Sequence, residues 1–141
     1  MKNLLIATLL VCFSSVSYSQ GWSLVWEDDF SGTTLDQSKW THDLGTGSQY
    51  GLWGWGNGEL QFYQSGNAEV SNGTLKIIAK EEANGIVDSW GNTMYYSSSK
   101  IKTENKFEVR YGKIEARIKT VNGEGFWPAF WMLPSGGSWP C

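Results

Sequence analysis

The stretch from Tyr111 to Leu133 constrains the fold more than any other part of the chain. Residues 113–119 alternate strictly, with apolar side chains at even positions and charged side chains at odd positions. This period of two predicts a half-buried strand. Residues 125–133 are apolar at both parities, which predicts a second strand that is covered on both faces. A glycine-containing loop would join the two strands.

The aromatic and glycine content favours an all-β domain. The chain has 9 Trp, 6 Tyr, 6 Phe and 17 Gly, which is typical of aromatic strands separated by glycine turns. No segment keeps a helical period, so we predict a single all-β domain. Further strands are predicted at residues 22–30, at 59–63, near Lys100 and at 107–111.

A hairpin and a loop complete the expected scaffold. Residues 68–78 predict a hairpin, because Asn72-Gly73 is a dipeptide typical of a two-residue turn between alternating arms. Residues 81–90 are polar and contain Gly85, so we predict a surface loop there.

Four side chains in the 111–133 stretch indicate a carbohydrate cleft. Glu115 and Arg117 share the charged face of the first predicted strand, and Trp127 and Trp131 share one face of the second. At strand spacing the two tryptophans lie about 13 Å apart, a separation that spans several sugar rings. The alternatives are an ion pair for Glu115 and Arg117, and core packing for the tryptophans. We place Trp131 in a groove shared with Arg117 and leave Trp127 open.

Trp55 and Asn57 lie in a glycine-rich loop at residues 45–58. Glycine loses much backbone entropy on folding, so such a loop needs something to order it. A bound sugar would do so, because aromatic rings stack on sugar faces and an asparagine amide both donates and accepts hydrogen bonds. The alternative is a lid packed over the end of the sheet.

Residues 1–19 predict a signal peptide. Lys2 precedes an apolar run at residues 4–13, and small polar residues precede Gln20. The run is too short to span a bilayer. A lipoprotein signal at Cys12 and a buried N-terminal strand are the alternatives. We therefore expect residues 20–141 to be secreted, to the extracellular space or the periplasm.

Charge and metal-ligand spacing limit the other partners. The net charge of −3 argues against nucleic acid and anionic membranes. No motif requires a cofactor, and His42 is the only histidine. Glu27, Asp28 and Asp29 could ligate a hard cation such as calcium. From the residues alone, a solvated strand end explains this acidic cluster better.

Three motifs carry a resemblance. WGNGELQFY, YGKIEARIK and GFWPAFWMLP, in this order, closely resemble the secreted β-glucanases of glycoside hydrolase family 16, especially laminarinase-like endo-1,3-β-glucanases. The resemblance implies a jelly-roll-like, concanavalin A-like β-sandwich and an asparagine in the cleft at Asn57. It also implies that Glu115 and Arg117 contact substrate or support the catalytic strand. It strengthens the case for a structural calcium, with Glu27 as a ligand.

The resemblance also sets an expectation about catalysis. The family's Glu-Ile-Asp-Ile-Met-Glu signature normally follows a Trp-Pro pair such as Trp139-Pro140, and the sequence ends at Cys141. We therefore expect residues 20–141 to be the N-terminal part of a catalytic domain that is incomplete at its C-terminus. The chain itself offers Glu59 and Glu115 as carboxylates, and we expect neither to be the nucleophile.

The intact protein would then cleave 1,3- or 1,3/1,4-β-glucans with retention, using two glutamates about 5 to 5.5 Å apart. This chain alone would be inactive. A non-catalytic glycan-binding module is the alternative. A third expectation is that the chain does not fold alone, because unpaired strands expose edges and apolar faces.

Overall fold

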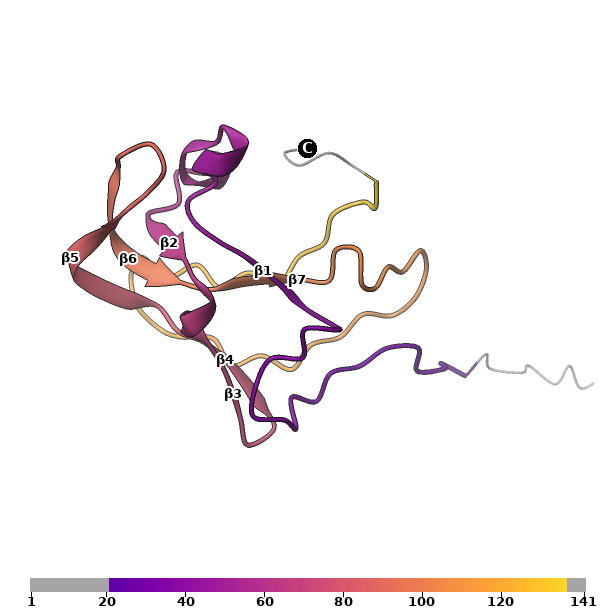
Figure 1. The fold of residues 1–141 in the computed structure, drawn as a ribbon. Coiled ribbons are helices and arrows are strands. Elements are labelled where there is room, and N and C mark those ends of the chain that lie inside the picture. The colour runs from indigo at the N-terminus through magenta and orange to yellow at the C-terminus, as the bar shows by residue number, and fades with distance from the viewer. Residues whose placement is uncertain (1–20, 137–141) are drawn as a thin grey trace, which may run out of the picture.

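The structure is a computed structural model that describes residues 21–136. Its elements are short strands and single 3₁₀ turns, and no α-helix occurs in that range (Figure 1). The strands are β1 (Thr41–Asp43), β2 (Gln61–Tyr63), β3 (Ala68–Ser71), β4 (Thr74–Ile77), β5 (Lys80–Val87), β6 (Thr93–Ser98) and β7 (Lys100–Lys102). The 3₁₀ turns are η1 (Ser48–Tyr50), η2 (Trp53–Gly56) and η3 (Ser65–Asn67).

The strands form three small sheets. In the largest, β6 is central, with β2 parallel on one side and β5 antiparallel on the other. β1 pairs antiparallel with β7, and an ion pair of 2.7 Å between Lys102 and Asp43 joins them. A bridge between Gly45 and Tyr63 ties the chain after β1 to the end of β2. The predicted strands at 59–63 and near Lys100 are therefore present.

The predicted hairpin is confirmed. β3 and β4 pair antiparallel from Ala68 opposite Ile77 to Ser71 opposite Thr74. Asn72 and Gly73 have φ angles of 53° and 67°. Two successive positive φ angles match the right-handed twist of the flanking strands, which is why this dipeptide makes the turn.

The prediction of a surface loop at residues 81–90 is wrong for most of that segment. β5 runs to Val87 and pairs with β6, and its register shifts between Glu81 and Ile86. Gly85 lies in this bulge with φ 67°, and a β-carbon there would meet the Thr93 side chain. The polar composition misled the prediction because β5 is an edge strand with one solvated face.

The core is thin, so buried polar contacts contribute to holding the sheets together. Among the described residues, the buried apolar side chains are Trp55, Val70 and Met94. Asn67 is 1% exposed, and its Nδ2 donates to Ile78 O at 2.8 Å and to Ser97 Oγ at 3.0 Å. These bonds join η3 to β6 and to the short link between β4 and β5.

The predicted strand at residues 22–30 is wrong. This segment has no ladder partner within residues 21–136. Its Trp26 ring instead packs against Trp40 at 5.4 Å and stacks on Phe107 at 5.3 Å between ring centroids. Aromatic packing therefore fixes the segment without backbone pairing.

The strands predicted at 107–111 and within 111–133 are also absent. Figure 1 shows this part as an orange-to-yellow trace without arrows that runs around the sheets. Alternation makes a segment suitable for a half-buried strand, but backbone pairing also requires a neighbouring strand. Within residues 21–136 no strand pairs with this segment. The assignment of side chains in 113–133 to two faces of a sheet therefore does not apply.

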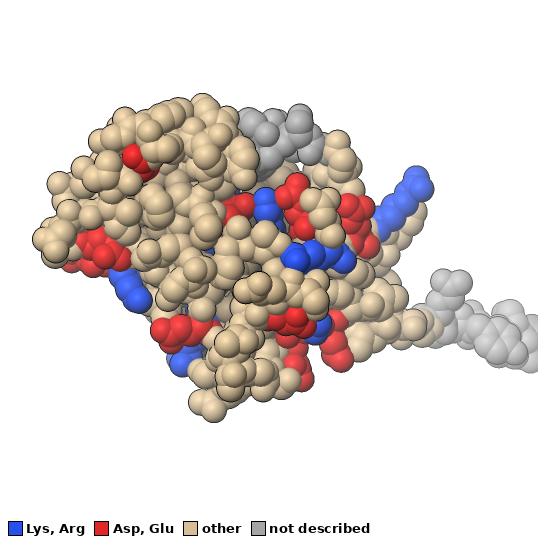
Figure 2. Space-filling view, viewed as in Figure 1, with Lys and Arg blue, Asp and Glu red and all other residues tan. Residues whose placement is uncertain are grey.

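Charges of both signs share the visible surface. Figure 2 shows Lys and Arg interspersed with Asp and Glu on the face viewed, so this face has no extended single-sign patch. Within residues 21–136, no helix has the length and apolar character that a membrane crossing needs. The predicted signal peptide, residues 1–19, lies outside the described residues.

Candidate functional site

A row of polar side chains runs along β2 and the residues before it. Glu59, Gln61 and Tyr63 share one face because alternate residues of an extended segment point the same way. Gln61 Nε2 donates to Tyr63 Oη at 2.7 Å and to Glu59 Oε2 at 3.3 Å. Asn57 Nδ2 donates to Glu59 Oε1 at 2.9 Å. Amide, carboxylate and phenol groups are thus lined up, a set that can both donate to and accept from sugar hydroxyls.

Tyr63 remains a neutral phenol in this row. Burial raises the pKa of its hydroxyl, and the neighbouring Glu59 carboxylate raises it further. A phenol that does not ionise near neutral pH can donate its proton to a hydroxyl oxygen.

The glycine-rich loop brings Trp55 to this row. Gly54 and Trp55 have φ angles of 51° and 54°, and a β-carbon on Gly54 would lie 2.5 Å from Glu59 N. Only glycine permits that approach. Trp55 is 2% exposed, and its indole N–H donates to Gly45 O at 3.2 Å. The loop therefore has the packed, lid-like arrangement, with the Trp55 ring inside it.

Lys100 is the centre of an aromatic cluster. Its Nζ lies 4.1 Å from the centroid of the Trp55 ring, 5.6 Å from that of Tyr63 and 5.5 Å from that of Trp131. These distances are in the range of cation–π attraction. One ammonium on β7 thus joins the loop, β2 and the segment after residue 125.

The charge of Lys100 is held in a partly desolvated place. Burial lowers the pKa of its ammonium, while the Glu59 and Asp43 carboxylates act in the opposite direction, and the net shift is downward. The cluster therefore combines a cation, a carboxylate and three aromatic rings, which suits the binding of a polar ligand with apolar faces.

The six residues predicted to bind substrate divide into two groups. Trp55 and Trp131 both contact Lys100, and Asn57 joins the same site through Glu59. The other three belong to the unpaired segment and are exposed: Glu115 makes an ion pair with Lys113 at 2.9 Å, Trp127 is 91% exposed, and Arg117 lies between them in sequence. Contact with substrate stays a prediction for all six.

Sequence reasoning missed three members of this site. Gln61 and Tyr63 were detectable, because the alternation in ELQFY puts them on the Glu59 face. Lys100 carried no signal, because its partners lie about 30 to 45 residues away on both sides and only the fold brings them together.

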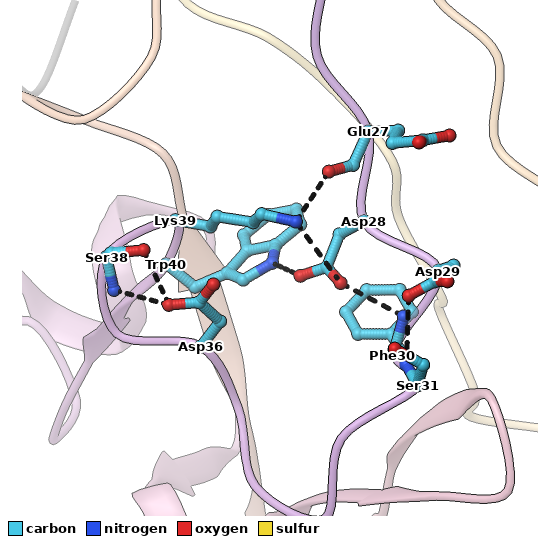
Figure 3. A network of polar contacts seen from close by, with 9 residues as sticks. All are labelled: Glu27, Asp28, Asp29, Phe30, Ser31, Asp36, Ser38, Lys39 and Trp40. Atoms are coloured by element: carbon cyan, nitrogen blue, oxygen red, sulfur yellow. Dashed lines mark hydrogen bonds and ion pairs between the residues drawn. The ribbon is translucent and has the colours of Figure 1, made fainter.

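The acidic cluster at residues 27–29 organises a turn (Figure 3). Asp28 accepts hydrogen bonds from the Trp40 indole at 2.7 Å and from Phe30 N at 3.0 Å, and Asp29 accepts one from Ser31 N at 3.0 Å. Hydrogen bonding to Ser31 lowers the pKa of the Asp29 carboxyl. Both carboxylates therefore already accept hydrogen bonds, from their own turn and, for Asp28, from Trp40 as well.

Glu27 stands apart from that network. Its carbonyl oxygen accepts from Lys39 Nζ at 2.7 Å, while Figure 3 shows its carboxylate directed away. No group of three or more His, Cys, Asp or Glu within residues 21–136 is arranged to hold a metal ion. Calcium takes six to eight oxygen ligands, backbone carbonyls and waters included, and a calcium site that includes Glu27 stays a prediction.

Comparisons with known proteins give these features a context. Residues 56–140, more than half of the chain, match the model of glycosyl hydrolases family 16. The chain is 40% identical over 126 residues to glucan endo-1,3-beta-glucosidase A1 of Niallia circulans, covering 84% of this chain and 18% of that protein. It is 36% identical over 138 residues to glucan endo-1,3-beta-glucosidase of Cryptopygus antarcticus, covering 94% and 47%.

A solved structure supports the same relation. The catalytic domain of an endo-1,3-beta-glucanase (laminarinase) from Thermotoga petrophila RKU-1 aligns with a TM-score of 0.61 and 42% identity, covering 65% of this chain and 35% of that one. The prediction of an all-β, jelly-roll-like fold is thereby confirmed. The chain spans less than half the length of each of these relatives. It belongs to glycoside hydrolase family 16.

Proposed function

We propose that this chain supplies a glucan-binding site, formed by the residues around Lys100, of a secreted endo-β-glucanase. The intact protein would cleave 1,3- or 1,3/1,4-linked β-glucans by a retaining mechanism with two glutamates. The site around Lys100 carries the proposal, because it combines a row of hydroxyl-binding groups with aromatic rings. The names of the relatives, glucan endo-1,3-beta-glucosidase and laminarinase, support the substrate class.

Within this site the side chains have separate roles. Asn57, Glu59 and Gln61 would bind sugar hydroxyls, and the half-exposed Trp131 ring would stack on a sugar face. The buried Trp55 would pack beneath the glucan-binding site and hold Lys100 in place. Arg117, Glu115 and Trp127 lie in the unpaired segment away from the Lys100 contacts, and we propose them as substrate contacts in the intact enzyme only.

Glucan binding by residues of this site can be measured on the 141-residue chain. Electrophoresis through a gel containing laminarin should retard the wild-type chain. Asn57→Ala should bind several-fold more weakly, because a hydroxyl loses one partner. Asn84→Ala removes the same exposed amide from β5 and should leave binding unchanged. Equal retardation of wild type and Asn57→Ala would contradict the assignment.

A non-catalytic glycan-binding module is the second candidate. It would use the sugar-binding groups of the described residues without a catalytic pair, since Glu59 is engaged by Asn57 and Glu115 by Lys113. A retaining pair must instead face each other across one bond. We therefore expect the 141-residue chain to release no reducing ends from laminarin, and robust release would refute this.

The coding sequence beyond codon 141 separates the candidates. A Glu-x-Asp-x-x-Glu motif encoded directly beyond codon 141 would support the hydrolase, and a stop codon there would favour the binding module.

Secretion is part of the proposal as well. N-terminal sequencing of the protein from culture medium should start at Gln20, and a retained Met1 would contradict the predicted signal peptide.

A further inference from the structure

The connection between β5 and β6 contains a carboxylate that is buried and fully engaged. Asp88 is 8% exposed. Its Oδ1 accepts the backbone N–H groups of Trp90 and Asn92, each at 2.9 Å, so one oxygen caps its own turn. Its Oδ2 accepts the Thr46 hydroxyl at 2.8 Å, across 42 positions of sequence. A single side chain therefore bonds both its own turn and the glycine-rich loop.

The loop end of this contact leads directly to Trp55. Thr46 is 2% exposed, and its carbonyl oxygen accepts the backbone N–H of Trp55 at 2.8 Å. Two successive hydrogen bonds thus connect Asp88 to the residue whose ring lies under Lys100. A second contact between the loop and the β5–β6 connection lies beside the first. Ser48 Oγ is 2.6 Å from Ser89 Oγ and 3.1 Å from Thr46 Oγ1.

The surroundings of Asp88 favour the charged form of its carboxylate. Burial raises the pKa of Asp88, but hydrogen bonds from Thr46, Asn92 and Trp90 lower it, and the net shift is downward. Hydrogen bonds to a charged acceptor are stronger than neutral ones. This matters because the glycines on either side of Thr46 leave the loop little order of its own.

We propose that Asp88 is a positioning residue for the glucan-binding site. Through Thr46 it fixes the glycine-rich loop, and so places Trp55 beneath Lys100. It does not touch the ligand. Its consequence for binding rests on the proposed function, whereas its effect on the loop does not. Figure 1 shows the β5–β6 connection and the η1–η2 coil at the same end of the molecule.

Hydrogen exchange on the 141-residue chain tests the anchor. Thr46→Val removes the donor of this bond, and Asp88→Asn removes the charge of its acceptor. Either should accelerate exchange of the Trp55 amide at least about tenfold, as expected for losing a hydrogen bond to a charged group. The β3–β4 hairpin amides should stay protected. Thr46→Ser keeps the hydroxyl and should restore slow exchange. Asp29→Asn, a carboxylate that caps only its own turn, is the matched control.

The double variant and a binding measurement complete the test. Asp88→Asn combined with Thr46→Val should loosen Trp55 no more than the stronger single change, because both act on one bond. Unchanged Trp55 exchange in Thr46→Val would overturn the proposal. So would a loosened loop that binds laminarin as tightly as wild type. A wild-type chain without laminarin affinity would overturn the proposed function, while the exchange data would still decide the anchor.

Discussion

Single side chains secure the parts of this molecule that lack a ladder. Asp28 accepts a 2.7 Å hydrogen bond from the Trp40 indole, 12 residues along the chain, and one from Phe30 N. Its side chain is 8% exposed. Lys100 has a corresponding role, because its ammonium lies against three aromatic rings from separate segments. Where the apolar core is thin, such polar and cation–π contacts carry a larger share of the tertiary structure.

Asp28→Asn should destabilise the fold. The amide would place an N–H group against the donor of Trp40 or of Phe30, leaving a buried polar group without a partner. The expected loss is about 1–3 kcal/mol in the free energy of unfolding, measured by urea denaturation. Asp36→Asn is the control, because that carboxylate is exposed and accepts its hydrogen bonds from its own turn, chiefly from Ser38. Equal losses in the two variants would contradict the role of Asp28.

Gly54→Ala tests the approach between the loop and Glu59. Its β-carbon would meet Glu59 N at 2.5 Å, whereas the β-carbon of Gly51→Ala would meet nothing within 4 Å at a similarly positive φ. Both substitutions incur backbone strain. Only Gly54→Ala adds overpacking, so its stability loss should exceed that of Gly51→Ala by about 1–3 kcal/mol. Calorimetric melting of both variants measures the difference, and equal melting temperatures would argue against the close contact.

At the scale of elements, pairing decides what alternation alone cannot. Residues 113–119 alternate strictly and yet form no strand, whereas the polar β5 pairs along β6 and carries a bulge at Gly85. The turn at Asn72-Gly73 was predictable because its chemistry is local. The strand character of β5 was not, because it depends on pairing with β6 across the connection at residues 88–92 and on one solvated face.

This contrast predicts amide exchange. Amides of residues 113–119 should exchange close to the rate of an unstructured chain, because no neighbouring strand accepts their hydrogen bonds within residues 21–136. Amides of β6 should exchange far more slowly, since this strand is paired on both sides. Exchange measured by mass spectrometry on the 141-residue chain checks this. Comparable protection of the two segments would mean that 113–119 has found a partner.

At the scale of the whole molecule, the exposed apolar surface is the dominant feature. Tyr111 is 83% exposed, Trp127 91% and Met132 63%, all in the unpaired segment. Exposed large apolar side chains in this number favour association.

We expect the 141-residue chain to self-associate as its concentration rises. Trp127→Ser should weaken the association, because it removes the most exposed ring of the unpaired segment. Trp22→Ser, a 75% exposed tryptophan outside that segment, should change it less. Sedimentation velocity over a dilution series distinguishes these cases. A monomer at every concentration would show that the segment is protected in solution.

Local chemistry determined much of this protein from its sequence. The all-β class, the hairpin turn at Asn72-Gly73 and the family follow from residue type and short-range spacing, which require no knowledge of distant contacts. Only the tertiary structure decided that Lys100 meets Trp55 and Trp131, that Asp88 holds Thr46, and that residues 113–133 lack a ladder. The physical reason is that pairing and burial depend on which segments meet in space, and no local pattern specifies the partner.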